Sequence, residues 1–130
     1  MTNFSSLSKG EYEVLADFRS ALRHYLAFSK HVAETAGITV EQHQALLSVI
    51  GFPGREHVTI GELADRLQVR HQSAVGLVNR LVEQGLVERW QNPDDKRQVF
   101  IGLTQKGLGV LESLSGMHRD ELQRLGPQLR

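Results

Sequence analysis

The sequence predicts a mainly α-helical protein with a small β-hairpin, and three observations support this fold class. Two short amphipathic helices are expected at residues 59–67 and 71–84, separated only by residues 68–70. An apolar pattern of period two follows Gly85 and is typical of strands. Long apolar-striped helices are expected at both ends of the chain. The order helix, tight turn, helix and hairpin is that of a winged helix-turn-helix.

The first expected helix covers residues 9–36. Ser8 and Glu11 have the spacing of a capping box, and Gly37 can adopt the left-handed conformation that ends a helix. Such a helix is about 42 Å long, more than one small winged domain can cover. Its apolar face therefore predicts a partner surface in a symmetric homodimer. That face consists of Leu15, Phe18, Leu22, Tyr25, Leu26, Ser29, Val32, Ala33 and Ala36.

Three further helices follow the same local rules. Thr39 with Gln42 and Thr59 with Glu62 form capping boxes, and the helix that begins at Thr39 is expected to end near Gly51. The two helices of the central motif repeat an apolar spacing of i, i+3, i+4 and i+7, so they can pack on each other. The apolar positions are Leu46, Val49 and Ile50 in the helix that begins at Thr39, Ile60, Leu63, Ala64 and Leu67 in the helix at 59–67, and Ala74, Leu77, Val78 and Leu81 in the helix at 71–84.

A hairpin is expected directly after these helices. Gly85 can end the last helix. Within residues 98–103, Val99, Ile101 and Leu103 recur at every second position, and residues 86–91 are the expected partner strand. Residues 92–97 begin with turn-forming side chains and end with basic ones. A basic hairpin tip beside a helix-turn-helix is a wing, and Trp90 is expected to pack the wing onto the body.

After the wing, Thr104 caps a C-terminal helical region, with an interruption expected near Gly116. Its expected buried positions are Leu108, Leu111, Leu114, Leu122 and Leu125. We expect one domain over residues 1–130, with dimerisation helices at 1–37 and 104–130 and the winged helix-turn-helix at 38–103.

Composition narrows the function classes. The chain has 130 residues and no cysteine, which excludes disulfides and thiolate metal sites. No apolar run approaches the roughly 20 residues of a membrane span, and residues 1–6 lack the regions of a signal peptide, so a cytoplasmic location is expected. The net charge is zero, but residues 66–97 carry a net charge of +2, which favours a nucleic-acid partner only mildly.

Four segments carry a family resemblance. They are Gly37-Ile-Thr-Val-Glu-Gln-His-Gln-Ala-Leu-Leu, Thr59-Ile-Gly-Glu-Leu-Ala, Leu77-Val-Asn-Arg-Leu-Val-Glu-Gln-Gly-Leu-Val-Glu-Arg, and Asn92-Pro-Asp-Asp-Lys-Arg with Leu103-Thr-Gln-Lys-Gly. With them, the chain resembles the MarR (multiple-antibiotic-resistance regulator) family of transcription regulators. The resemblance implies a ligand-responsive homodimeric repressor that reads a pseudo-palindromic operator in double-stranded DNA. A small, often phenolic, ligand frequently releases such a dimer from its operator.

Two features depart from the family pattern. Gly76, preceded by Val75, stands where many relatives carry an arginine in the middle of the recognition helix. The base-reading chemistry is therefore left to fewer polar groups. The C-terminal region is also short, which leaves the extent of the dimer interface open.

The second helix of the motif is expected to enter the major groove with its N-terminal end. Gln72 is the best candidate for a bidentate contact to adenine, Ser73 for a base or phosphate contact, and Val75 for contact with a thymine methyl. A polar residue on a helix face is otherwise simply solvated. The full outward set is His71, Gln72, Ser73, Val75, Gly76, Asn79 and Arg80.

Basic side chains are the candidates for contacts with the DNA phosphates and with the minor groove. Arg97 resembles the wing arginine of the family, which reaches a narrow minor groove, and Asp95 would restrain its guanidinium. Asp95 and Arg97 could instead form only a surface ion pair. The expected phosphate contacts are Arg70, Arg80 and Lys96.

The first helix carries the candidate effector site. Tyr25, Phe28, Ser29 and His31 could line a pocket for a small aromatic or phenolic ligand, or could equally be ordinary core. Zinc would need a convergence of His24, His31 and His43, but their spacing is not diagnostic, and structural histidines are favoured. We therefore expect no metal and no cofactor.

Three function classes follow from these patterns. A DNA-binding transcription regulator is favoured. The alternative is a winged-helix dimer that does not bind DNA and acts as a protein-interaction module, which the zero net charge and Gly76 keep open. An enzyme is not expected, because no nucleophile–base pair, phosphate-binding glycine loop or metal motif has diagnostic spacing.

Overall fold

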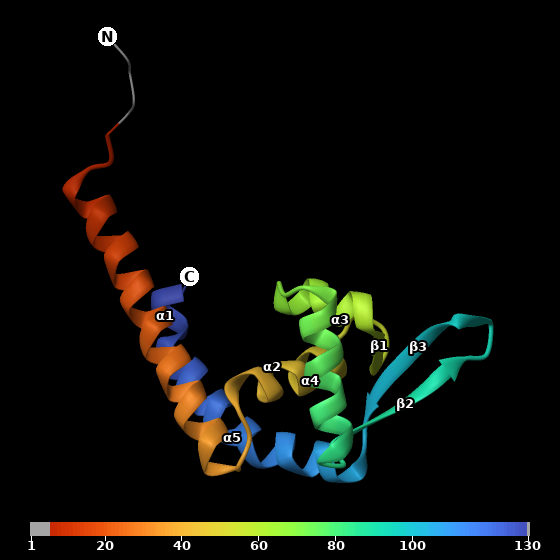
Figure 1. Ribbon diagram of the computed structural model, residues 1–130. Helices are drawn as coiled ribbons and strands as arrows, with labels where there is room; N and C mark the ends of the chain where they lie inside the picture. The colour runs from red at the N-terminus through yellow and green to blue at the C-terminus, as the bar shows by residue number, and fades with distance from the viewer. Residues whose placement is uncertain (1–5, 130) are drawn as a thin grey trace.

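Residues 6–129 are described by a computed structural model, and they form five helices and a small antiparallel sheet that lies to one side of them (Figure 1). No helix in this range is long and apolar enough to cross a membrane. The N-terminal residues 1–5 and the side chain of Leu125 lie outside the described part. The elements are α1 (Lys9–Thr35), α2 (Val40–Ile50), β1 (His57–Thr59), α3 (Ile60–Leu67), α4 (His71–Glu83), β2 (Val87–Asn92), β3 (Asp95–Leu103) and α5 (Gln105–Leu129).

The predicted capping boxes are present at the start of α1, α2 and α3. In α3, the amide of Glu62 donates to Thr59 Oγ1 over 3.1 Å, and Glu62 Oε1 accepts from the Thr59 amide over 2.9 Å. Each reciprocal pair supplies partners to amides that a helix leaves open at its N-terminus. Gly37 and Gly85 adopt positive φ after α1 and α4, as predicted.

The sheet has one strand more than predicted. β1 pairs antiparallel with β3, which gives the order β1-β3-β2. Only three residues form β1, too few to show a period-two pattern, and their hydrogen-bond partners lie more than 40 residues further along the chain. The central side chain of β1, Val58, is fully buried and ties the start of the helix-turn-helix to the wing.

Helix α5 is continuous, so the predicted interruption near Gly116 is wrong. A glycine inside a helix costs only about 1 kcal/mol relative to alanine, and Leu111 and Leu114 anchor this stretch in the core. Leu108 is half-buried, and Leu122 is exposed in the single chain. The burial of Leu122 stays a prediction for the homodimer.

Figure 1 shows α1 and α5 side by side, with the N-terminal half of α1 projecting away from the winged domain. The core lies between these two helices, the helix-turn-helix and the sheet. Its largest fully buried side chains include Leu46, Leu63, Leu81, Leu86, Ile101 and Leu114.

Candidate nucleic-acid interface

The N-terminal turn of α4 presents polar side chains to solvent. His71, Gln72 and Ser73 are exposed, whereas Ala74 is fully buried. No side chain caps the helix at Arg70, so its first amides and the positive end of its dipole are open to an anion. In Figure 1 this end of α4 and the β2–β3 turn lie toward the same side of the molecule.

The turn that precedes α4 has the predicted length and one unusual backbone conformation. Gln68 adopts φ 56°, the sole positive φ at a non-glycine position between residues 6 and 129. The amide of Val69 donates to the Ala64 carbonyl over 3.0 Å, and the Gln68 side chain donates to the Asp65 carbonyl over 2.8 Å. These bonds satisfy the end of α3 and set the direction in which α4 begins.

Further along α4, the outward side chains have different surroundings. Asn79 is exposed, and its Oδ1 accepts a 2.7 Å hydrogen bond from Arg89 Nη1 on β2. Arg80 is exposed, and Val75 is half-buried. A Cβ at Gly76 would lie 3.8 Å from Arg80 Nη1, so a side chain would fit there.

The wing tip holds its arginine in a defined orientation. Asp95 Oδ1 accepts from both the amide and Nε of Arg97 over 3.1 Å, and Asp95 Oδ2 accepts from Arg97 Nη2 over 3.3 Å. The Arg97 side chain, followed by its backbone amide, lowers the pKa of the Asp95 carboxyl. The Arg97 side chain nevertheless remains 91% exposed, so it is oriented by Asp95 and free to meet a ligand.

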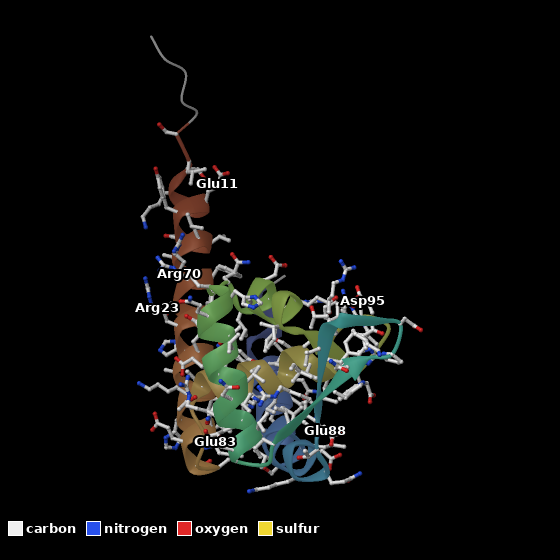
Figure 2. All side chains as sticks on the ribbon, turned by 45° about the vertical axis from the view of Figure 1, so that its right-hand side comes forward. Glu11, Arg23, Arg70, Glu83, Glu88 and Asp95 are labelled. Carbon is white, nitrogen blue, oxygen red and sulfur yellow. The ribbon has the colours of Figure 1, made fainter. Side chains whose placement is uncertain are left out.

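Charge is unevenly distributed over the winged domain. In Figure 2, Arg70 and Asp95 lie toward the upper end of the molecule, whereas Glu83 and Glu88 lie toward the lower end. Glu83 and Glu88 thus lie away from Arg70 and the α4 N-terminus, whereas the acidic Asp95 lies toward the same end as Arg70. Lys96 is exposed beside Arg97.

The base of the wing packs through aromatic rings, as predicted for Trp90. The Trp90 ring lies 5.9 Å from His57 and 6.1 Å from Phe100, centroid to centroid. A Cβ at Gly102 would come within 2.7 Å of the Trp90 ring, so glycine is needed for this contact. The packing fixes the wing relative to the body of the domain.

Sequence reasoning missed a second group of side chains, which joins the loop between α2 and β1 to α3. Arg55 forms an ion pair with Glu62, and its guanidinium lies 4.4 Å from the Phe52 ring centroid. Arg66 approaches the same ring at 5.1 Å. Burial tends to raise the pKa of the Glu62 carboxyl, but hydrogen bonds from Thr59 and Arg55 lower it overall.

The structure gathers three of the four candidate effector residues around a side chain that the sequence did not single out, His118 of α5. Tyr25 and Phe28 meet the His118 ring edge to face, at 6.0 and 5.7 Å, and Ser29 is within hydrogen-bond distance of it. His31 is exposed and takes no part in these contacts. An adjacent cavity of about 290 Å³ is lined by Tyr25, His43, Leu47, Leu111, Ser115, His118, Arg119 and Leu122.

The three histidines considered for zinc do not converge. His24 and His31 are exposed on α1, whereas His43 is buried against His118. In the described part of the chain, no group of three or more His, Asp or Glu side chains is placed to hold a metal ion.

Comparison of the sequence with known proteins gives two matches of note. Residues 36–98 match the sequence model of the MarR family. The Bacillus subtilis (strain 168) protein named "Uncharacterized HTH-type transcriptional regulator YsmB" is 28% identical over 117 residues, which cover 85% of this chain and 77% of that protein.

Solved structures share the architecture. The crystal structure of a mutant MarR from E. coli complexed with operator DNA is 26% identical, with a TM-score of 0.71 over 97% of this chain and 89% of that chain. AbsC, a MarR family transcriptional regulator from Streptomyces coelicolor, is 18% identical, with a TM-score of 0.74 over 92% of this chain and 80% of that chain. The AbsC likeness, at that identity, concerns the fold alone.

Proposed function

Because this chain belongs to the MarR family of transcription regulators and is not an enzyme, we propose that it is a cytoplasmic homodimer that binds a pseudo-palindromic operator and represses transcription. The observation that carries the proposal is the joint exposure of the α4 N-terminus and the Asp95-oriented Arg97 on one side of the molecule. A helix end and a wing tip on one side suit a major groove and the adjacent minor groove.

Each side chain of the proposed interface receives a role from its position. Gln72 at the first turn of α4 reads an adenine edge, with Ser73 and Val75 beside it. Arg97 enters the minor groove and Asp95 orients it, which the two side-chain hydrogen bonds between them support. The remaining contacts, to phosphates or to the edges of the half-site, are those of Arg70, His71, Asn79, Arg80 and Lys96.

Substituting Gln72 and Arg97 separately tests this division of labour. Gln72→Ala should cost about 1–3 kcal/mol on the operator and relax preference at one base pair per half-site, because a base contact is lost. Arg97→Ala should weaken specific and non-specific binding together and lower the salt slope by about one per chain. The operator is first selected from a random DNA pool, and affinities are then measured at several salt concentrations.

Two variants away from the proposed interface serve as controls. Gln105→Ala on α5 and Arg23→Ala on α1 remove matched, exposed side chains and should leave the affinity and its salt slope unchanged. Arg97→Ala binding as tightly as the parent at every salt concentration would overturn the wing assignment. Failure of the protein to enrich any DNA would favour the protein-interaction module instead.

The homodimer is supported by an apolar strip that the single chain leaves uncovered. Leu15, Phe18, Leu22 and Leu26 lie on one face of α1 and are 39–46% exposed. Large apolar patches on a monomer mark association surfaces, and a two-fold axis would pair this strip with itself. We therefore assign residues 1–37 and 104–130 to dimerisation and residues 38–103 to the winged helix-turn-helix.

We also propose an effector site at the cavity beside Tyr25. Its lining combines apolar walls with imidazole and phenol groups, which suits a small aromatic acid or phenol. Phe28 and Ser29 support the site through their contacts with His118, while the exposed His31 lies outside it. The ligand would favour a dimer whose α4 helices are wrongly spaced for successive major grooves.

Calorimetry against a panel of phenols and aromatic acids tests the effector proposal. A member of the panel should release or absorb heat on binding and weaken operator affinity, because it would bind the two dimer arrangements unequally. The His31→Ala variant should respond like the parent. Absence of heat from every member, with unchanged operator affinity, would count against an effector at this site.

A further inference from the structure

Two histidines meet where the winged domain rests on the long helices. The ring centroids of His43 on α2 and His118 on α5 are 4.6 Å apart, with 39° between the ring planes. His43 is 4% exposed. Helix α2 belongs to the winged helix-turn-helix, and α5 belongs to the proposed dimerisation segment. The His43–His118 pair therefore connects these two parts of the chain.

Both ring nitrogens of His118 form hydrogen bonds that can persist in the neutral and in the protonated ring. Its Nδ1 lies 2.9 Å from the Leu114 carbonyl oxygen, which only accepts, so Nδ1 carries the hydrogen. Its Nε2 lies 2.9 Å from Ser29 Oγ of α1. The hydroxyl can donate to a neutral ring and accept from a protonated one. Both hydrogen bonds of His118 are therefore compatible with a neutral ring and with a protonated one.

His43 is in the opposite situation. Its Nδ1 is buried without a hydrogen-bond partner, the one such side-chain atom in the described part of the chain. Burial, followed by the positive charge that His118 can acquire, lowers the pKa of His43. A second proton on the pair would place two like charges side by side in a poorly solvated position.

The surroundings offer the pair no compensating negative charge. From α1 the titratable neighbour is Tyr25, whose pKa is raised by burial and then by Glu121. From α5 the charged neighbours are Arg119, which lines the same cavity, and Glu121, which is paired with Arg124. Arg124, and to a smaller extent the nearby His24, lower the pKa of the Glu121 carboxyl. Other elements packed on α2 give neither ring a hydrogen bond or ion pair within residues 6–129.

We propose that the His43–His118 pair is a proton-sensitive joint that loosens the packing of α2 on α5 at mildly acidic pH and thereby weakens DNA binding. The DNA readout rests on the proposed function. The sign follows from linkage: an opened state, with His43 in water, binds more protons than the packed state. The packed state is therefore fully stabilised above the ordinary histidine pKa of about 6.5 and loses stability as the pH falls below it.

Operator affinity should accordingly fall about tenfold between about pH 7.5 and about pH 5.5. In His43→Asn this loss should disappear, because the titrating group is gone. His24→Asn removes an exposed histidine from α1 and should keep the tenfold loss of operator affinity.

A general charge effect would have the opposite sign. Protonation of exposed groups such as His71 adds positive charge and would strengthen DNA binding, so a loss of affinity at low pH separates the proposed joint from such an effect. A pH response of His43→Asn equal to that of the parent would overturn the proposal.

Proton NMR titration of the histidine rings in the DNA-free protein gives a second readout. His43 should titrate below the ordinary histidine pKa of about 6.5, and His118→Asn should raise the His43 pKa by removing the neighbouring charge. A His43 pKa at or above the ordinary histidine value of about 6.5 would overturn the proposal, even if the protein binds DNA. If no operator is found at about pH 7.5, the proposed function fails while this titration still decides on the joint.

Discussion

Gly107→Ala is expected to destabilise the protein by about 3 kcal/mol or more. A Cβ at this position would lie 2.0 Å from the Leu86 carbonyl oxygen and 2.9 Å from the Leu86 carbonyl carbon. Both are backbone atoms, and the Thr104 amide donates to the same oxygen over 3.1 Å. The first turn of α5 would therefore have to move away from Leu86, the residue before β2. This movement would break the hydrogen bond between the Thr104 amide and the Leu86 carbonyl. Urea unfolding followed by circular dichroism measures the loss.

Gly109→Ala is the matched control for this substitution. Gly109 lies two residues further along α5, and an added Cβ would have no neighbour within 4 Å. Alanine there should stabilise the protein by roughly 0.5–1 kcal/mol, because glycine is a poor helix former. Equal stabilities of the two alanine variants would show that the contact at Leu86 relaxes without cost, contrary to this expectation.

Leu22→Glu is expected to convert a dimer into monomers and to reduce operator affinity by more than about 100-fold. Leu22 lies in the middle of the exposed apolar strip of α1. Burying a carboxylate there without a partner costs several kcal/mol per ion, and a two-fold axis applies that cost twice. Sedimentation at micromolar concentration should give twice the chain mass of 14.6 kDa for the parent and that mass itself for the variant.

Ser20→Glu provides the comparison on the same helix. Ser20 is exposed and faces away from the strip, so the added charge should leave both the mass and the operator affinity of the parent unchanged. A parent chain that sediments as a monomer with full helical content would contradict the dimer, and with it the pseudo-palindromic operator.

Much of the fold could be predicted from the sequence, because the determining interactions are local. Each capping box joins residues three apart, as in Ser8 with Glu11, and each amphipathic face repeats within a few turns. Gly85 was identified because the chain must reverse there with a positive φ. The Asp95–Arg97 contact was expected from the resemblance of Arg97 to the wing arginine of the family, and it spans only two residues. The DNA-contacting set remains a prediction, since binding depends on a partner molecule.

The sequence by itself determined the positions of the helices and the hairpin, the exposed start of α4 and the apolar strip of α1. Only the tertiary structure decided what meets across the chain. β1 exists because β3 supplies its hydrogen bonds, and α5 continues through Gly116 because Leu111 and Leu114 are anchored in the core. Ser29 and His118, separated by 89 positions, meet because α1 and α5 pack together. Periodicity and capping report interactions within one or two helical turns, whereas these contacts depend on packing between elements distant in sequence.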